Sequence, residues 1–256
     1  MRGAVFVIAA LCLGGVLGCG EEDAAIFATD ARKANGLVVI LPGIEGESEY
    51  NHDIRAGLMD AGVPYALVIR PWGVPVPGIG MIVNQTNFLG NRMAGTSVAQ
   101  MIAQYQDSHP DKPVYIVGHS GGGGVAVFTA EALADTPGDH KVDGLVLLSA
   151  SISGDYDLTK ALSRTRSGLV NFYNREDTGA LGLGTTIAGN VDGGRAPSAG
   201  RVGFEKTFAG LHQRELDPSM SGGDAHGSTT HGPFVSTYVA PWILSAAWPP
   251  GVRSAR

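Results

Sequence analysis

The segment Gly118-His119-Ser120-Gly121-Gly122 places one serine hydroxyl between small residues, directly after the β-forming run PVYIVG at 113–118. It satisfies the pattern G-x-S-x-G between a predicted strand and a predicted helix from Gly121 to about Ala134. In that setting the serine lies on a sharp, strained turn, and a side chain at Gly118 or Gly122 would collide with the neighbouring strand or helix. The turn lifts the hydroxyl above the strand end and points the Gly121 amide toward a developing oxyanion. These residues predict a serine nucleophile.

A glycine-rich turn after a strand could instead bind a phosphate. That function requires the lysine of a P-loop or the spacing G-x-G-x-x-G, and neither is present here. A serine hydroxyl is a weak nucleophile until a base removes its proton and a third group orients that base. A histidine and a carboxylate are therefore expected elsewhere in the chain.

The surrounding elements alternate between strands and helices. Apolar and β-branched runs predict buried strands, and residues 93–109 carry apolar side chains at helical spacing. The predicted strands are 36–43, 65–73, 113–118, 144–150 and 168–174. Strands separated by helices require crossover connections, so we expect an α/β fold with a mostly parallel sheet.

With the serine turn in this setting, the chain resembles the α/β-hydrolase family from about Asn35 to Trp248. The resemblance implies a central sheet flanked by helices and the chain order serine, acid, histidine, each residue following a strand. No large cap domain fits between the strands at 144–150 and 168–174.

The acid is expected after the strand at 168–174, where the sequence offers Glu176 and Asp177. Asp177 is favoured because it adjoins Thr178-Gly179, a turn that would hold a short carboxylate firmly. Asp155 and Asp157 also follow a strand, but an earlier one, and remain fallback acids.

The base is expected on the loop before the last helix, which should begin near Pro233. His226 is favoured because Gly222 and Gly223 let its loop dip toward the serine. His231 would lie almost at the helix start, where it could instead be a residue of the pocket rim or of the solvated surface.

The loop LPGIEGES at 41–48 is expected to supply the second oxyanion donor. The family often has His-Gly in this loop, and Pro42-Gly43 stands in that position here. The amide of Ile44 is then the expected donor, with Glu45 as the alternative. Residues 71–88 could line an acyl or alcohol site or serve only packing, and the Gly-rich stretch at 184–208 could rim the pocket.

The N-terminus predicts export. Arg2 precedes an apolar stretch from Ala4 to Leu17 that suits a secretory signal, and Val16-Leu17-Gly18-Cys19 resembles a bacterial lipobox. We expect a lipoprotein-type signal peptide at 1–18, a lipid on Cys19, a tether at 19–34 and the catalytic domain at 35–256. An ordinary cleaved signal with an incidental cysteine is the alternative.

The composition of the chain limits the kinds of partner that we expect it to bind. The 18 basic residues form no run and face 24 acidic residues, which argues against nucleic acid as a partner. A metal site at Asp224, His226 and His231 is a poor candidate because no helix aligns the two histidines. We expect no cofactor and no metal.

These features predict a serine hydrolase, most simply a carboxylesterase or lipase-like enzyme that forms an acyl-enzyme on a small-molecule ester. A peptidase or another acyl-transfer enzyme on the same fold remains open. A lipid-anchored binding protein without turnover is the alternative from another class. The expected location is the cell envelope, at the outer membrane of a two-membrane bacterium, or otherwise outside the cell.

Overall fold

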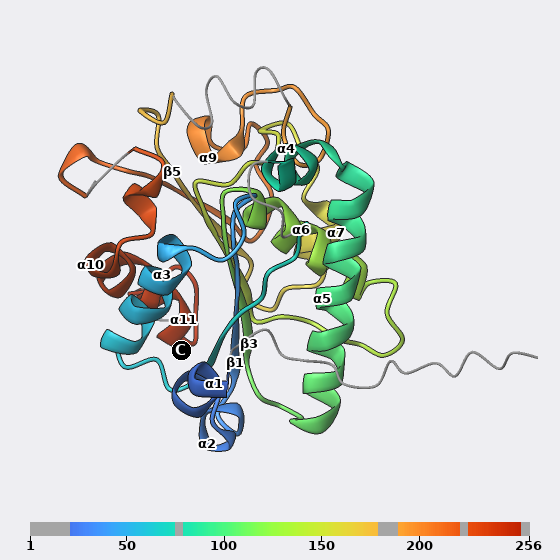
Figure 1. Cartoon of the computed structure of the whole chain (residues 1–256), viewed down its shortest axis with the longest axis vertical. Helices are drawn as coiled ribbons and strands as arrows, with labels where there is room; N and C mark the ends of the chain where they lie inside the picture. The colour runs from blue at the N-terminus through green and yellow to red at the C-terminus, as the bar shows by residue number, and fades with distance from the viewer. Residues whose placement is uncertain (1–20, 75–78, 179–188, 221–224, 252–256) are drawn as a thin grey trace, which may run out of the picture.

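A computed structural model describes residues 21–74, 79–178, 189–220 and 225–251 of the chain. Its centre is one six-stranded sheet in the order β2-β1-β3-β4-β5-β6, and every neighbouring pair is parallel (Figure 1). The strands are β1 (Leu37–Leu41), β2 (Ala66–Ile69), β3 (Val114–His119), β4 (Gly144–Leu148), β5 (Leu169–Tyr173) and β6 (Leu211–Glu215). The expected α/β fold is confirmed.

The sheet is buried on both faces, which explains its uninterrupted apolar strands. In β1 the side chains of Leu37, Val39 and Leu41 pack into one core, and those of Val38 and Ile40 pack into the other. Successive side chains of a strand point to opposite faces, so a strand between two helical layers needs apolar residues at every position.

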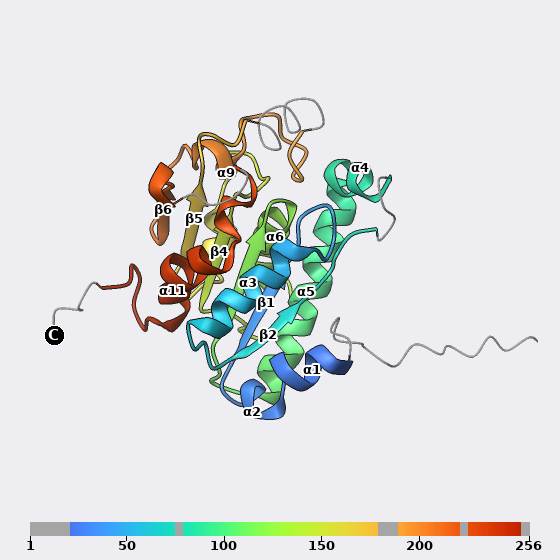
Figure 2. The same cartoon turned by 60° about the vertical axis from the view of Figure 1, so that its left-hand side comes forward.

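Helices form the two outer layers, as Figures 1 and 2 show. One face carries α5 (Phe88–Ser108), α6 (Gly121–Leu133) and α7 (Thr159–Leu162). The other carries α3 (Glu49–Asp60), α10 (Gly232–Phe234), the π-helix η4 (Val235–Val239) and α11 (Ala240–Leu244). Two short helices, α4 (Ile79–Thr86) and α9 (Ala199–Val202), lie at the carboxyl end of the sheet. Single-turn 3-10 helices occur at η2 (Pro218–Met220) and η3 (Gly227–Thr229).

Two elements differ from the sequence-based expectations. The helix expected at 93–109 begins earlier, at Phe88, and α4 precedes it within a segment expected only as a pocket wall or packing. Strand β6 was not predicted, because its sequence LHQRE carries no apolar run. It lies at the sheet edge, where its side chains are half-buried or exposed, so the apolar pattern of a buried strand is not required.

The expected tether at 19–34 is largely helical. Helix α1 (Glu21–Phe27) and helix α2 (Asp30–Lys33) replace a flexible segment. The Arg55 guanidinium contacts the Asp23 carboxylate at 2.8 Å and lies 3.9 Å from the centre of the Phe27 ring. Residues of this segment therefore contact the domain that is expected to begin at residue 35. The predicted signal peptide and Cys19 lie outside the described residues.

Within the described ranges, no helix has the length and apolar character needed to cross a bilayer.

Candidate active site

The site lies where the strand order reverses. The chain runs from β1 outward to β2, then returns across β1 to β3 and continues in the opposite direction to β6. In open parallel sheets, ligands bind at the carboxyl ends of the strands at such a reversal, which here lies between β1 and β3. Ile44 follows β1 and Ser120 follows β3, so both predicted residues lie at this reversal of the strand order.

Ser120 adopts the strained backbone that its motif predicts. Its φ and ψ are 51° and −121°, in a region that residues other than glycine rarely occupy. A Cβ at Gly118 would overlap the carbonyl of Gly122, and a Cβ at Gly122 would overlap the carbonyls of Leu41 and Pro42. Both glycines are required because the obstructing atoms are backbone, which cannot turn aside.

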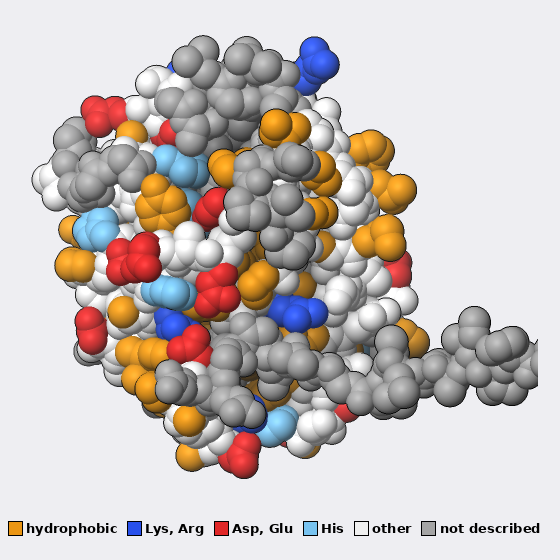
Figure 3. Space-filling model, viewed as in Figure 1, with side chains coloured by type: hydrophobic (Ala, Val, Ile, Leu, Met, Phe, Trp, Pro, Cys, Tyr) orange, Lys and Arg blue, Asp and Glu red, His pale blue; other side chains and the backbone are white. Residues whose placement is uncertain are grey.

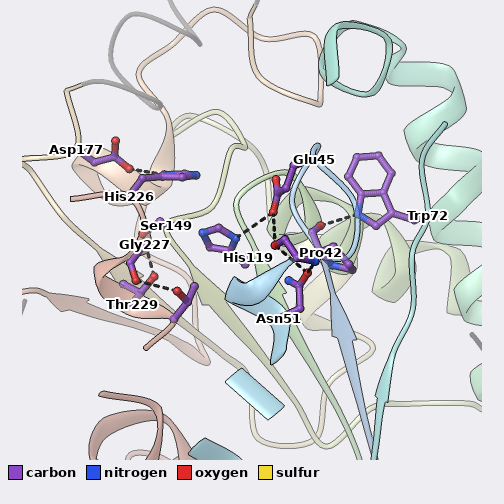
Figure 4. Close-up of polar contacts among 12 residues, drawn as sticks. Pro42, Glu45, Asn51, Trp72, His119, Ser149, Asp177, His226, Gly227 and Thr229 are labelled. Atoms are coloured by element: carbon purple, nitrogen blue, oxygen red, sulfur yellow. Dashed lines mark hydrogen bonds and ion pairs between the residues drawn. The ribbon is translucent and has the colours of Figure 1, made fainter. Parts of the chain in front are cut away.

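Asp177 and His226 meet in the structure, from two loops 49 residues apart. The His226 Nδ1 lies 2.6 Å from the Asp177 Oδ2, and the Asp177 side chain is only 1% exposed (Figure 4). A carboxylate can only accept, so Nδ1 carries the shared proton. Nε2 of the neutral ring is then an acceptor, as a general base requires.

The loops that carry the acid and the base are joined by Asn174, the residue after β5. Its Nδ2 donates to the Ala225 carbonyl at 3.0 Å and to the Ser228 Oγ at 3.3 Å. Its carbonyl accepts from the Asp177 amide at 3.1 Å. A second buried link joins the Ser149 and Thr229 hydroxyls at 3.0 Å (Figure 4). These contacts fix the imidazole relative to its carboxylate.

The acid–base pair lies beside the serine turn. The ring of His119, the residue before Ser120, has its centroid 4.9 Å from that of His226 (Figure 4). The His119 Nδ1 faces the Glu45 carboxylate at 3.9 Å, and its ring also packs 5.1 Å from that of Tyr50. The segment after β3, which carries the nucleophile candidate, thus lies beside the loop before α10, which carries the base candidate.

The competing residues lie elsewhere. His231 caps α10, where its Nδ1 accepts from the Phe234 amide at 3.4 Å. Glu176, Asp155 and Asp157 are exposed, and Asp157 accepts from the Thr159 amide at 2.8 Å. Asp224, from the disfavoured metal site, lies outside the described residues.

The two predicted oxyanion donors are the backbone amides of Gly121 and Ile44. A Cβ built on Gly121 would lie 3.4 Å from the Ile44 nitrogen, so the amino end of α6 and the loop after β1 approach closely. The loop after β1 is held in place by Trp72, whose Nε1 donates to the Pro42 carbonyl at 2.7 Å (Figure 4). The Glu45 side chain is directed toward His119. Two N–H donors that serve one oxygen atom must lie on segments this close together.

Comparisons with known proteins identify the family of the chain. The family model described as alpha/beta hydrolase fold matches residues 36–182, more than half of the chain. The chain belongs to the α/β-hydrolase family. No curated protein sequence gives a significant match.

Among solved structures, this α/β hydrolase is similar in fold to several hydrolases. Aspergillus fumigatus lipase B matches 82% of this chain and 53% of its own length, at 11% identity and a TM-score of 0.51. Esterase PE8 matches 72% of this chain and 84% of its own, at 15% identity and a TM-score of 0.42. The RedJ thioesterase of Streptomyces coelicolor matches 81% of this chain and 88% of its own length, at 13% identity and a TM-score of 0.44. At 11% identity, the likeness to lipase B shows the fold alone.

Sequence reasoning missed the support that α4 gives to this α/β hydrolase site. The buried Asn84 donates from Nδ2 to the Ile44 carbonyl at 2.9 Å and accepts from the Val74 amide at 2.7 Å. Gln85 donates from Nε2 to the Ser151 Oγ at 3.2 Å. Two adjacent amide residues in a charge-free segment rich in apolar residues were the available signal.

Within the described residues, no group of three or more His, Cys, Asp or Glu side chains could hold a metal ion.

Proposed function

We propose that this α/β hydrolase cleaves carboxylic esters of small molecules, as a carboxylesterase or lipase-like enzyme, with Ser120, Asp177 and His226 as its triad. The 2.6 Å contact between Asp177 and His226, beside the strained Ser120 turn, carries the proposal. A carboxylate of an ordinary loop is exposed to solvent. The Asp177 carboxylate is instead only 1% exposed and lies against the His226 imidazole.

In the proposed reaction, His226 removes the Ser120 proton as Oγ attacks the ester carbonyl carbon. The carbonyl oxygen becomes an oxyanion, which the amides of Gly121 and Ile44 stabilise. The C–O bond to the alcohol breaks, and protonated His226 donates its proton to the departing oxygen. Water then attacks the acyl-enzyme with His226 as base, which releases the acid and restores Ser120.

We also propose that the chain is exported and anchored to the cell envelope through a lipid on Cys19. The lipobox-like sequence at 16–19 and the preceding apolar stretch support this proposal. In a two-membrane bacterium we expect the outer membrane, because Gly20 rather than aspartate follows the cysteine.

A fluorophosphonate probe tests the reaction. We expect covalent labelling of Ser120 in the wild type and none in Ser120→Ala, and a loss of ester hydrolysis on the order of 10³-fold or more in the variant. The melting temperature should change little, since the hydroxyl serves chemistry rather than packing. If the folded wild type neither reacts nor hydrolyses any ester in a graded p-nitrophenyl series, a binding protein without turnover is the better description.

A further inference from the structure

Helix α4 and the first turns of α5 are inverted relative to an ordinary surface helix. Their amide residues Asn84, Gln85 and Asn91 are buried, with exposed fractions of 8% or less. Their large apolar residues face outward, with exposed fractions from 44% to 69%. We refer to Met81, Ile82, Phe88, Leu89 and Met93 as the α4–α5 patch. A surface helix normally buries its apolar side, so this orientation requires an explanation.

The buried amides fix the orientation of both helices. Asn84 and Gln85 bond to the loops around the active site, as described above. Asn91 donates to the Asn84 and Val191 carbonyls at 2.9 and 3.0 Å. Turning the apolar side chains inward would break these bonds and leave buried polar groups unsatisfied. The bonds of the buried amides therefore keep the α4–α5 patch facing outward. One of them, from Asn84 to the Ile44 carbonyl, also supports the loop after β1.

The patch concentrates exposed apolar side chains on helices that contact the loops around the site. Of the nine large apolar side chains exposed in the described part of the chain, six lie between Val74 and Met93. Figure 3 shows hydrophobic side chains over α4 and the upper part of α5. Isolated exposed apolar residues are normal, whereas a concentrated group marks a binding surface.

Charge decides the kind of surface that fits. No charged residue occurs from Pro71 to Asn91. The first charge after this segment, Arg92, is directed toward α6, where it contacts Glu131 at 3.0 Å and lies over the Phe128 ring at 4.7 Å. The whole chain has a formal net charge of −6, which disfavours an anionic surface. A surface that is apolar and uncharged is complementary to this patch.

We propose that the α4–α5 patch docks onto an uncharged lipid surface, and that the substrate is a water-insoluble neutral ester presented there. Burial of the five side chains supplies the attraction, and docking brings the neighbouring active site to the aggregated ester. The substrate class rests on the proposed function, whereas docking itself does not.

Site-specific fluorescence tests docking. Cys12 and Cys19 are the only cysteines of the chain, so replacing both by serine gives a background for one labelled cysteine. Leu89→Cys and the control Leu244→Cys replace leucines that are 61% and 47% exposed. With phosphatidylcholine vesicles, we expect an environment-sensitive label to shift to shorter wavelength at position 89 and not at 244. No shift at 89, or equal shifts, would overturn docking. A larger shift on adding phosphatidylglycerol would contradict the uncharged surface.

Kinetics test the substrate class. The double variant Ile82→Ser and Leu89→Ser should have a lower ratio of the rate on emulsified tributyrin to the rate on dissolved p-nitrophenyl acetate. We expect the ratio to fall by on the order of tenfold or more. The control pair Ile26→Ser and Leu244→Ser, also at exposed apolar positions, should leave this ratio within about twofold. Equal ratios in the two pairs would refute the substrate class.

The outcomes separate this proposal from the proposed function. If dissolved esters are not hydrolysed but the label at position 89 shifts, the function fails and docking stands. If dissolved esters are hydrolysed without the shift, docking fails alone. A dimer that dissociates in the Ile82→Ser and Leu89→Ser variant, without any vesicle response, would assign the patch to self-association and overturn lipid docking.

Discussion

At the scale of single residues, burial separates the expected acid from its sequence neighbour. Asp177 is buried against His226, whereas Glu176 is exposed. We expect Asp177→Asn to lower kcat by on the order of 10²-fold to 10⁴-fold, since an amide at this position can turn its NH₂ group toward Nδ1 and favour the wrong tautomer. Steady-state hydrolysis of a dissolved ester measures this. Glu176→Gln is the matched control and should keep nearly full activity; the opposite ranking would transfer the role to Glu176.

The two histidines of the same loop also differ in their contacts. His226 pairs with Asp177, and His231 caps a helix. His226→Ala should slow fluorophosphonate labelling of Ser120 by on the order of 10³-fold or more. His231→Ala should label at nearly the wild-type rate and lose about 1 kcal/mol of stability as the cap is removed. Rapid labelling of His226→Ala alongside an unreactive His231→Ala would reverse the assignment.

At the scale of elements, the turn from β3 to α6 depends on how closely it approaches the loop after β1. A methyl group at Gly122 would overlap two backbone carbonyls, at Leu41 and Pro42. Gly122→Ala should therefore reduce the free energy of unfolding by about 2 kcal/mol or more and lower the melting temperature by about 5 °C.

Gly232 is the matched control for this substitution. It also lies at the start of a helix, but its nearest obstructing atom is 3.9 Å from the added methyl group. Gly232→Ala should change stability by no more than about 0.5 kcal/mol. Thermal unfolding of both variants checks the contrast, and equal melting temperatures would show that the β1 loop can move away from Gly122.

At the scale of the whole molecule, the first described residues and the candidate active site lie at opposite ends of the sheet (Figures 1 and 2). Cys19 is two residues before α1, which lies with α2 at the end of the sheet opposite α4 and α9 (Figures 1 and 2). A chain anchored through Cys19 would then direct its active site away from the anchoring membrane. The lipid surface proposed for the α4–α5 patch would be a separate ester aggregate.

Lipidation itself can be tested in cells. Cys19→Ser should move the protein from the membrane fraction to the soluble fraction, and globomycin should cause the wild-type precursor to accumulate, since the modified cysteine directs cleavage. Cys12→Ser is the control and should be processed normally, because Cys12 lies within the apolar stretch. Unchanged processing of Cys19→Ser would indicate an ordinary secretory signal.

The sequence by itself determined the features that depend on local pattern. Continuous apolar runs predicted five of the strands, because a strand covered on both faces needs apolar residues at each position. The G-x-S-x-G turn was also predictable, since only glycine fits where backbone meets backbone. Asp177 and His226 could be ranked above their neighbours from the strand, turn and loop around them.

Only the tertiary structure decided which distant groups meet. The 2.6 Å approach of Asp177 and His226 depends on how two loops fold over the sheet edge, which no local pattern encodes. The inverted orientation of α4 was also hidden, because apolar periodicity predicts the buried side of a helix only when apolar packing sets its orientation. Here Asn84 and Gln85 set it instead, through partners 40 and 66 residues away in the chain.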